Sequence, residues 1–238
     1  FLIGDEPLAR LAAAKVAVFG VGGVGGFCVE ALARAGVGTL HLYDDDTVSE
    51  SNLNRQIVAL HSTIGQPKAE VMARRILDIN PACQVEVFRM FYLPENADQV
   101  DLSQYDYVVD CIDTVAAKLD LVERCTALQV PILSAMGSGN KLDPTAFRVT
   151  DLSKTQGCPL ARVMRKELRK RGITHLKVLY STEEPLTPLQ PAEEEAPAGT
   201  DTRPRSTARR ATPGSISFVP AAAGLVAASA VIRDLGGF

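Results

Sequence analysis

Residues 15–44 read KVAVFGVGGVGGFCVEALARAGVGTLHLYD, and this stretch decides the fold. A short apolar run from Lys15 to Phe19 leads into a glycine turn, then into apolar residues at helical spacing from Val24 to Ala35. A second apolar run from Thr39 to Tyr43 follows. Parallel strands need a crossover connection between them, so the order strand, turn, helix, strand is how a parallel sheet begins. The sequence therefore predicts an α/β protein.

The alternation of strands and helices continues to Leu133. Further elements are predicted as a helix over 67–79, strands over 85–87 and 107–109, a helix over 116–128 and a strand over 130–133. The first of these helices ends at Asn80-Pro81, because the residue before a proline avoids the helical region. We expect a Rossmann-like, mostly parallel sheet with helices on both faces.

The pattern changes beyond Gly137. Strands are predicted over 147–149, 177–180 and 216–219 without crossover helices of the same kind, which indicates a smaller, partly antiparallel C-terminal extension. We place the boundary at 139, giving units 1–139 and 140–238. Residues 183–213 contain few large apolar side chains, so a mobile loop is expected there. The apolar stretch 219–232 is shorter than the roughly 20 residues of a membrane helix and is typical of a core or interface helix.

Composition narrows the function classes. The chain has 238 residues, 46% of them hydrophobic, which suffices for one sizeable core, and its net charge of −3 gives no overall attraction to nucleic acid. The five cysteines form no C-x-x-C pair, and the three histidines show no ligand spacing. A zinc site and a disulfide framework are therefore not expected, and a reducing, cytoplasmic setting without a membrane segment fits best.

The glycine turn predicts a nucleotide site. Gly20, Gly22, Gly23 and Gly25 stand between a strand and a helix, where free N–H groups and the helix dipole favour a phosphate. Asp44, at the end of the next strand, is suitably placed to accept hydrogen bonds from ribose hydroxyls. A glycine turn needed only for packing is the alternative. These features alone would equally suit a nicotinamide-dependent dehydrogenase.

Three charged residues favour a triphosphate. Arg55, Lys68 and Asp113 follow separate strands or begin a helix, so they are expected to converge at the carboxyl edge of the sheet. An arginine and a lysine can neutralise β and γ phosphates, and an aspartate can hold magnesium on them. The alternative for each residue, taken singly, is an ordinary role as an exposed or helix-capping side chain.

The chain resembles the ubiquitin-activating-enzyme-like superfamily of adenylating enzymes. The matching motifs are GVGGVG at 20–25, YDDD at 43–46, NLNRQ at 52–56, QPK at 66–68 and DCID at 110–113. The resemblance implies ATP and magnesium as cofactors. It implies nucleotide contacts by Asp44, Asp46, Asn54, Arg55, Gln56 and Lys68, and magnesium binding by Asp113.

The second half is similar to one branch of that superfamily, the tRNA threonylcarbamoyladenosine dehydratases. The similar segments are TDLSKT at 150–155, PLA at 159–161, YSTE at 180–183 and PGSISFVP at 213–220. The resemblance implies a homodimer that adenylates the threonyl carboxylate of modified tRNA, together with a sulfur-transfer protein as a further possible partner. An arginine that relatives place just before Phe1 lies outside this sequence.

Two other function classes stay open from the sequence. One is adenylation of a Gly-Gly-ended sulfur-carrier protein, although such activators typically hold zinc with paired C-x-x-C motifs that are missing here. The other is a nucleotide-sensing or NAD-binding module without adenylation. Binding of ATP rather than NAD would favour the two adenylating enzymes, the dehydratase and the sulfur-carrier activator, over this non-adenylating module.

A basic helix is predicted over 156–171. Its cations recur every three or four residues, and they are Arg162, Arg165, Lys166, Arg169, Lys170 and Arg171. Such a stripe could dock the phosphates of RNA, and a solvated helix face is the plain alternative. Arg203, Arg205, Arg209 and Arg210 could add to the same field. Cys158, directly before Pro159 near the start of this helix, is interpreted as an unreactive small residue rather than a nucleophile.

Overall fold

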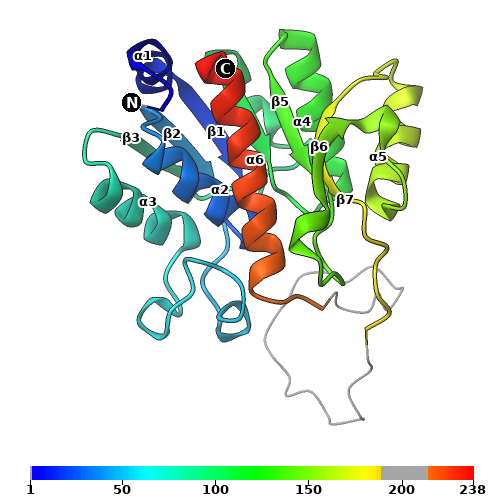
Figure 1. The fold of residues 1–238 in the computed structure, drawn as a ribbon, viewed down its shortest axis with the longest axis horizontal. Helices are drawn as coiled ribbons and strands as arrows, with labels where there is room; N and C mark the ends of the chain where they lie inside the picture. Colours follow the sequence, from blue (N-terminus) through cyan, green and yellow to red (C-terminus); the bar gives the residue numbers. More distant parts are fainter. Residues whose placement is uncertain (1, 189–213) are drawn as a thin grey trace.

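The computed structural model describes residues 2–188 and 214–238, and its strands form one seven-stranded sheet (Figure 1). The strands are β1 (Lys15–Phe19), β2 (Thr39–Tyr43), β3 (Gln84–Phe88), β4 (Tyr107–Asp110), β5 (Ile132–Ala135), β6 (Phe147–Asp151) and β7 (Lys177–Ser181). Their order is β3-β2-β1-β4-β5-β7-β6, with every pair parallel except β6 and β7. The predicted fold class, including the partly antiparallel extension, is confirmed.

Helices cover both faces of this sheet (Figure 1). They are α1 (Asp5–Ala13), α2 (Gly23–Arg34), α3 (Lys68–Ile79), α4 (Val115–Leu128), α5 (Pro159–Lys170) and α6 (Phe218–Gly236). In β1, Val16 and Val18 join the core beneath α2, α3 and α6, while Ala17 and Phe19 join the core beneath α4. Because the central strands are buried on both faces, their sequences are apolar throughout.

The C-terminal extension continues the same sheet. β7 pairs with β5 directly, and α5 connects β6 to β7 while its apolar side chains pack beside those of α4. The boundary at 139 falls in the segment after β5, and the division into two units stays a prediction. Of the predicted mobile loop 183–213, residues 189–213 lie outside the described residues, as do Arg203, Arg205, Arg209 and Arg210.

The strand predicted over 216–219 is wrong. Ile216 and Phe218 are exposed, Ser217 has helical backbone angles, and α6 begins at Phe218. Packing of the long apolar stretch that follows as one helix contributes more stability than four residues would contribute as an edge strand. Pro220 lies in the first turn of this helix, where its missing N–H removes no helical hydrogen bond.

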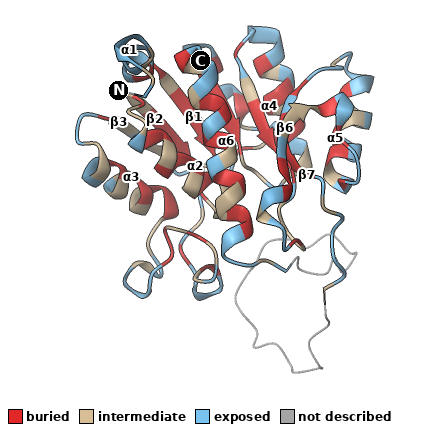
Figure 2. Cartoon of the chain, viewed as in Figure 1, coloured by how far each residue is buried: buried red, intermediate tan, exposed pale blue. Residues whose placement is uncertain are grey.

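The close approach of α6 to α2 depends on a glycine. A Cβ atom built at Gly224 would lie 2.4 Å from the Val24 carbonyl oxygen and 2.8 Å from the Phe27 Cβ. By length and composition α6 could cross a membrane. However, 44% of its apolar stretch is buried inside the protein, where the helix packs on α2 and the sheet (Figure 2). This packing is what a core helix shows, in agreement with the sequence-based prediction for 219–232.

A half-buried ion cluster joins α2 to α3. Glu30, with a side chain only 10% exposed, accepts hydrogen bonds from Arg75 Nε at 2.5 Å and Arg34 Nε at 2.8 Å. Burial alone would raise the pKa of Glu30, but the hydrogen bonds and charges of the two arginines outweigh it and lower that pKa. The ionised carboxylate therefore stabilises the fold.

Substituting Gly224→Ala tests the helix crossing. Alanine favours an isolated helix by about 1 kcal/mol over glycine, so an uncrowded site would gain stability. Here we expect a loss of about 1–3 kcal/mol, because the added methyl group meets α2. Urea denaturation measures the change, with Ser229→Ala on the exposed face of α6 as a control expected to stay within about 0.5 kcal/mol. An increase in stability would contradict the close packing.

Substituting Glu30→Gln tests the ion cluster as a function of pH. A lowered folded-state pKa means stability that is present above the usual glutamate pKa of about 4.3 and is lost as pH falls through the lowered value. We expect the variant to be less stable by about 1 kcal/mol at pH 7, after allowance for the exposed arginines. The difference should shrink as the pH falls below about 4.3 and through the lowered pKa of Glu30. Glu123→Gln, in an exposed pair with Arg171, should change little at either pH.

Candidate functional site

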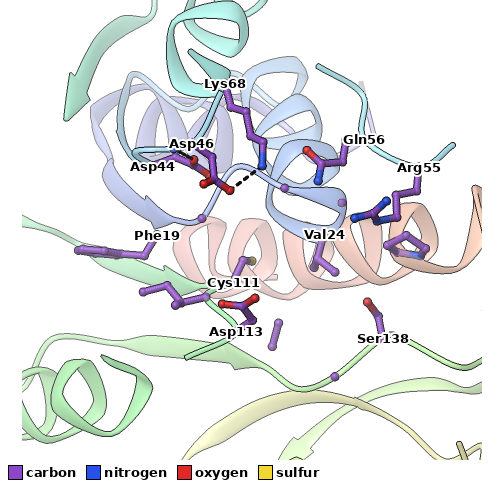
Figure 3. Close-up of a pocket in the computed structure, with 18 of the residues that line it drawn as sticks. Phe19, Val24, Asp44, Asp46, Arg55, Gln56, Lys68, Cys111, Asp113 and Ser138 are labelled. Atoms are coloured by element: carbon purple, nitrogen blue, oxygen red, sulfur yellow. Dashed lines mark hydrogen bonds and ion pairs between the residues drawn. The ribbon is translucent and has the colours of Figure 1, made fainter. Parts of the chain in front are cut away.

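A cleft of about 670 Å³ opens at the carboxyl ends of β1, β2, β4 and β5 (Figure 3). It is lined by most of the residues predicted for a nucleotide site, namely Gly20, Gly22, Gly23, Asp44, Asp46, Arg55, Gln56, Lys68 and Asp113. Asp44, Asp46 and Lys68 gather at one end, Arg55 and Ser138 lie at the other, and Asp113 lies between them. The structure thus brings together the three charged residues that the sequence predicted to converge.

The glycine turn is shaped by close backbone contacts. Gly20 has a φ of +88°, and a Cβ at Gly25 would lie 1.8 Å from the Gly20 carbonyl oxygen. A side chain at either position would therefore force the turn open. Gly25 supports the turn from beneath, while Gly22 and Gly23 face the cleft at the start of α2. The first N–H groups of α2 are thereby presented to the cleft, as phosphate binding requires.

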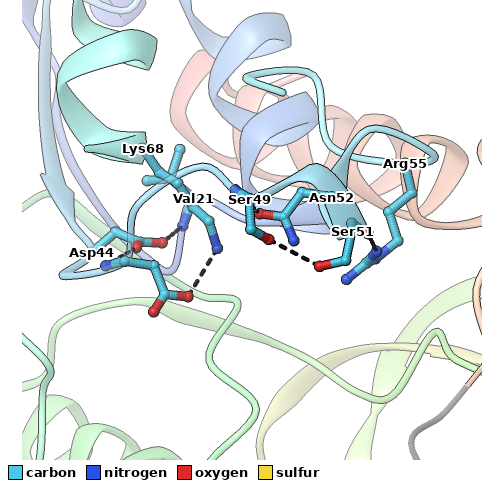
Figure 4. Close-up of polar contacts among 8 residues, drawn as sticks. Val21, Asp44, Ser49, Ser51, Asn52, Arg55 and Lys68 are labelled. Carbon is cyan, nitrogen blue, oxygen red and sulfur yellow. Dashed lines mark hydrogen bonds and ion pairs between the residues drawn. The ribbon is translucent and has the colours of Figure 1, made fainter. Parts of the chain in front are cut away.

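Asp44 holds the turn in place. Its Oδ2 accepts a hydrogen bond from the Val21 N–H at 2.6 Å, and its Oδ1 accepts one from the Asp46 N–H at 2.9 Å (Figure 4). Burial raises the pKa of Asp44, and these hydrogen bonds partly offset the increase. Each carboxylate oxygen has a second lone pair, so the group can also accept hydrogen bonds from a ligand in the cleft.

Lys68 reaches the cleft from the first residue of α3. It is 5% exposed, and its Nζ lies 2.8 Å from Asp46 Oδ2 (Figure 3). The Lys68 N–H also donates to the Asp46 carbonyl oxygen at 3.0 Å, so both ends of the residue are tied to the strand end at β2. A buried ammonium held in this way is a fixed positive charge that can attract phosphate oxygens.

Arg55 is oriented by its own loop. One Nη donates to the Ser51 carbonyl oxygen at 2.8 Å and to Asn54 Oδ1 at 2.9 Å. Asn54 does not line the cleft; its Nδ2 donates instead to the Ser215 carbonyl oxygen at 3.0 Å. The predicted phosphate ligand Asn54 therefore acts in this structure on the guanidinium and on a distant segment of the chain.

Asn140 fixes that distant segment. Its N–H donates to the Gly214 carbonyl oxygen at 2.8 Å, and its Oδ1 accepts from the Gly214 N–H at 2.6 Å. Its carbonyl oxygen accepts from the Leu186 N–H at 2.7 Å. Asn140 has a φ of +59°, a conformation that asparagine tolerates better than most residues. Hydrogen bonds thus connect Asn140 to Gly214 and, through the adjacent Ser215, to Asn54 and Arg55.

Gln56 carries an acceptor without a donor. Its Oε1 is buried and has no hydrogen-bond partner within residues 2–188 and 214–238, and the side chain lines the cleft. A buried acceptor left unsatisfied costs roughly 1–3 kcal/mol, so a donor supplied by a bound molecule would remove this cost. The observation favours a ligand with N–H or O–H groups at this end of the glycine turn.

Asp113 is exposed at the tip of a loop that is anchored from below. Asp110 and Lys118 are both fully buried, with Lys118 Nζ 2.9 Å from Asp110 Oδ2 and 2.7 Å from the Ala135 carbonyl oxygen. Asp110 Oδ1 also accepts from the Ile112 N–H at 3.1 Å. This buried pair fixes the loops after β4 and β5, which form one wall of the cleft.

Cys111 lines the cleft, but neither the cysteines nor the cations of α5 supply a charge there. Burial, together with the nearby Asp110 charge, raises the pKa of Cys111 to about 12, so this thiol stays protonated. Cys158 is 5% exposed, and its Sγ caps α5 by accepting from the Ala161 N–H at 3.5 Å. The five predicted nucleic-acid residues lie on α5, which reaches the cleft only through Leu160.

Sequence reasoning did not find Asn140, Ser138, Ser215 or Lys118. The glycine-flanked sequence GSGN at 137–140 marks a turn, but nothing local indicates that it contacts residues 214–215. Likewise, a lysine inside a helix is usually exposed, and only the tertiary structure shows that Lys118 pairs with Asp110.

Comparison with known proteins gives consistent matches over the whole chain. The ThiF family matches residues 1–238. The tRNA threonylcarbamoyladenosine dehydratase of Bacillus subtilis (strain 168) is 44% identical over 234 residues, covering 98% of this chain and 91% of the relative. The crystal structure of the Escherichia coli tRNA N6-threonylcarbamoyladenosine dehydratase in complex with ATP superposes with a TM-score of 0.85. It is 36% identical, covering 99% of this chain and 91% of that one.

The similarity to sulfur-carrier activators is shorter. The sulfur carrier protein ThiS adenylyltransferase of Escherichia coli (strain K12) is 37% identical over 135 residues, which cover 56% of this chain and 53% of the relative. The identity is thus comparable to that of the dehydratases, but the match extends over only about half of the chain.

Substitutions at Asn140 test the hydrogen-bond chain to Arg55. Asn140→Gly keeps the left-handed backbone accessible but removes the acceptor for the Gly214 N–H, so Asn54 and Arg55 lose their support. We expect ATP affinity, measured by calorimetry, to fall about 3–10-fold, the value of one hydrogen bond.

Asn140→Asp is the matched control, because it retains an oxygen acceptor at the same position. It should bind ATP as tightly as the unsubstituted protein does. Equal ATP affinity in both variants would show that Arg55 is held without Asn140.

Proposed function

The chain belongs to the ThiF family, and from this premise we infer that it is an ATP-dependent tRNA threonylcarbamoyladenosine dehydratase. The observation that carries the inference is the length of the match. The alignment with the Bacillus subtilis dehydratase, at 44% identity, covers 98% of this chain and so extends well beyond the nucleotide-binding half. The fold of the Escherichia coli relative solved with ATP superposes over nearly the whole chain.

The cleft suits a triphosphate better than a dinucleotide. A dinucleotide pyrophosphate is handled largely by a helix N-terminus, whereas a triphosphate needs additional cations at its β and γ groups. Lys68 and Arg55 supply two cations from separate elements that face the same cleft. We assign phosphate binding to these residues and to the N–H groups of the glycine turn, ribose binding to Asp44, and further nucleotide contacts to Asp46 and Gln56. Asn54, which lies outside the cleft lining, is assigned the positioning of Arg55.

Magnesium fits the site only as a partner of ATP. No cluster of three or more histidine, cysteine, aspartate or glutamate residues suited to a metal occurs in the described part of the chain. Mg²⁺ commonly binds through one or two carboxylates together with substrate phosphates, and Asp113 offers an exposed carboxylate in the cleft. We propose that Asp113 holds the ion, whose charge would assist departure of pyrophosphate.

The proposed reaction has two steps. An oxygen of the threonyl carboxylate attacks the α-phosphorus of ATP, and the bond to the β-phosphate breaks, which releases pyrophosphate and leaves an acyl adenylate. The carbamoyl nitrogen of the same side chain then attacks the acyl carbon, loses its proton and expels AMP as the ring closes. The protein's contribution is to position the two reactants and to neutralise developing negative charge with Arg55 and Lys68.

Two alternatives are less well supported. A Gly-Gly-ended sulfur-carrier substrate is disfavoured because the similarity to such an activator covers 56% of this chain. Carrier-stimulated exchange of labelled pyrophosphate would favour it. A nucleotide-binding module without adenylation leaves the convergence of Arg55, Lys68 and Asp113 unexplained. Tight NADH binding without ATP affinity would favour that reading.

The assembly is also part of the proposal. A homodimer agrees with the exposed apolar side chains of Phe218 and Leu225 on α6, which a second copy would cover. We also propose a reducing, cytoplasmic setting, to which five free thiols are suited. A sulfur-transfer partner stays a prediction that depends on the resemblance alone.

Substituting Arg55→Ala or Lys68→Ala tests the proposed site. Each change removes a cation from the phosphates, so formation of AMP and pyrophosphate in the presence of modified tRNA should fall about 100-fold or more. Liquid chromatography of the nucleotides measures this directly. Circular dichroism should show both variants folded.

The matched controls are Arg10→Ala and Lys177→Ala. Arg10 lies in α1, and Lys177 begins β7 at the sheet edge opposite the cleft. Each substitution therefore removes one positive charge outside the cleft. Both should retain full turnover. Wild-type turnover in the Arg55 and Lys68 variants would refute the site assignment.

A further inference from the structure

The outer face of α5 carries a shallow groove built from cations alone. A hollow of about 460 Å³ is lined by Arg162, Arg165, Lys166, Arg169 and Lys170. The opposite face of the helix is apolar, with Ala161, Met164 and Leu168 buried in the core beside α4 (Figure 2). These apolar contacts fix the orientation of the helix, so its cations face the solvent.

Not all of these cations are available to a partner. Arg165 donates to the Leu152 and Thr155 carbonyl oxygens at 3.2 and 2.8 Å, which uses its guanidinium to secure the helix. Lys170 pairs with Glu167 at 2.8 Å, and Arg171 pairs with Glu123 at 3.3 Å. These three residues have structural partners on the protein itself.

Three cations remain. The side chains of Arg162, Lys166 and Arg169 are exposed and form no hydrogen bond or ion pair with any other residue that the structure describes. Spaced four and three residues apart, they form one row along the helix, which we call the basic row. Glu167 offsets part of the charge of Lys166, but the three cations still repel one another, and a row of anions would relieve that repulsion.

The basic row leads to the cleft. Leu160, in the first turn of α5, lines the cleft wall together with Ser138 and Gly139. At 1.5 Å per residue, the row begins about 3 Å along the helix from Leu160 and ends about 13 Å from it. A chain of phosphates lying on the row would therefore approach the mouth of the cleft at one end.

We propose that the basic row docks the sugar–phosphate backbone of the RNA whose modified nucleotide enters the cleft. This inference rests on the proposed function, which supplies a tRNA substrate. RNA stems are recognised mainly through shape and backbone contacts, for which cations suffice. Val163 is the one large apolar side chain of α5 that is exposed, so the surface lacks the apolar centre that a protein partner would need.

The row also explains how an acidic chain binds RNA. A net charge of −3 gives no long-range attraction, so affinity has to come from a local patch. Each phosphate that a cation neutralises contributes about 0.7 to 0.9 to the dependence of log affinity on log salt concentration. Three cations should therefore account for a slope of roughly two to three.

The test is a triple variant, Arg162→Ala with Lys166→Ala and Arg169→Ala. Fluorescence anisotropy with labelled tRNA carrying threonylcarbamoyladenosine is measured from low to moderate potassium chloride. We expect the salt slope to fall by roughly two to three and affinity at low salt to fall at least about 10-fold. The KM for tRNA should rise, while kcat at saturating tRNA and the Kd for ATP should not change.

Two further variants make the result specific. Arg10→Ala with Arg124→Ala and Lys177→Ala removes the same total charge from ion pairs on α1, α4 and β7, and should leave the salt slope unchanged. Replacing Arg162 and Arg169 by lysine keeps the charge and should retain most of the binding. An unchanged slope in the alanine triple variant, or an equal loss in the distant control, would overturn the proposal.

Failure of the docking proposal is distinguishable from failure of the proposed function. If wild-type protein turns over modified tRNA and the alanine triple variant shows the same KM, the basic row is not the docking surface. If wild-type protein binds ATP but turns over no modified tRNA, the proposed function fails. The docking proposal could then still be judged from binding alone. It would be supported if the affinity of wild-type protein for tRNA depended on salt concentration and this dependence were weaker in the triple variant.

Discussion

The whole cleft depends on the carboxylate of Asp44. By accepting from the Val21 and Asp46 N–H groups it fixes the glycine turn at the start of α2 and the acidic strand end after β2 in one arrangement. Asp46 in turn holds Lys68, so one side chain sets the positions of the phosphate-facing backbone and of a buried cation. Burial works against this carboxylate by raising its pKa, and the hydrogen bonds offset part of that cost. The cleft is thus preorganised for an anion before any ligand arrives.

Local sequence patterns were enough to predict the sheet. The apolar runs at 15–19 and 39–43 match β1 and β2, because strands buried on both faces need continuous apolar side chains and turns need glycine. The predicted convergence of Arg55, Lys68 and Asp113 also follows from topology, since parallel strands end at one edge. α1 was not predicted, although Asp5 and Glu6 in its first turn and Arg10 in its last are suitable charges for a helix.

What the sequence could not predict involves contacts between distant segments. The strand expected over 216–219 is instead the segment that leads into α6 together with the first two residues of that helix, because packing of a whole helix outweighs the β-branched preference of a few residues. The contact of Asn140 with Gly214 and the burial of Lys118 beside Asp110 likewise involve partners that no spacing rule connects. The basic helix shows the same limit, since charge spacing identifies six cations but only the structure separates those with protein partners from those without.

The packing of α6 on α2 has a consequence for how the protein is made. Gly214, Ser215 and Pro220 complete the cleft wall, and Gly224 packs against the helix that begins at the glycine turn. Since a chain leaves the ribosome from its N-terminus, the nucleotide-binding motifs emerge long before the residues that close the site around them. A nascent chain therefore has a cleft that lacks one wall, and ATP binding should arise only once synthesis has passed α6.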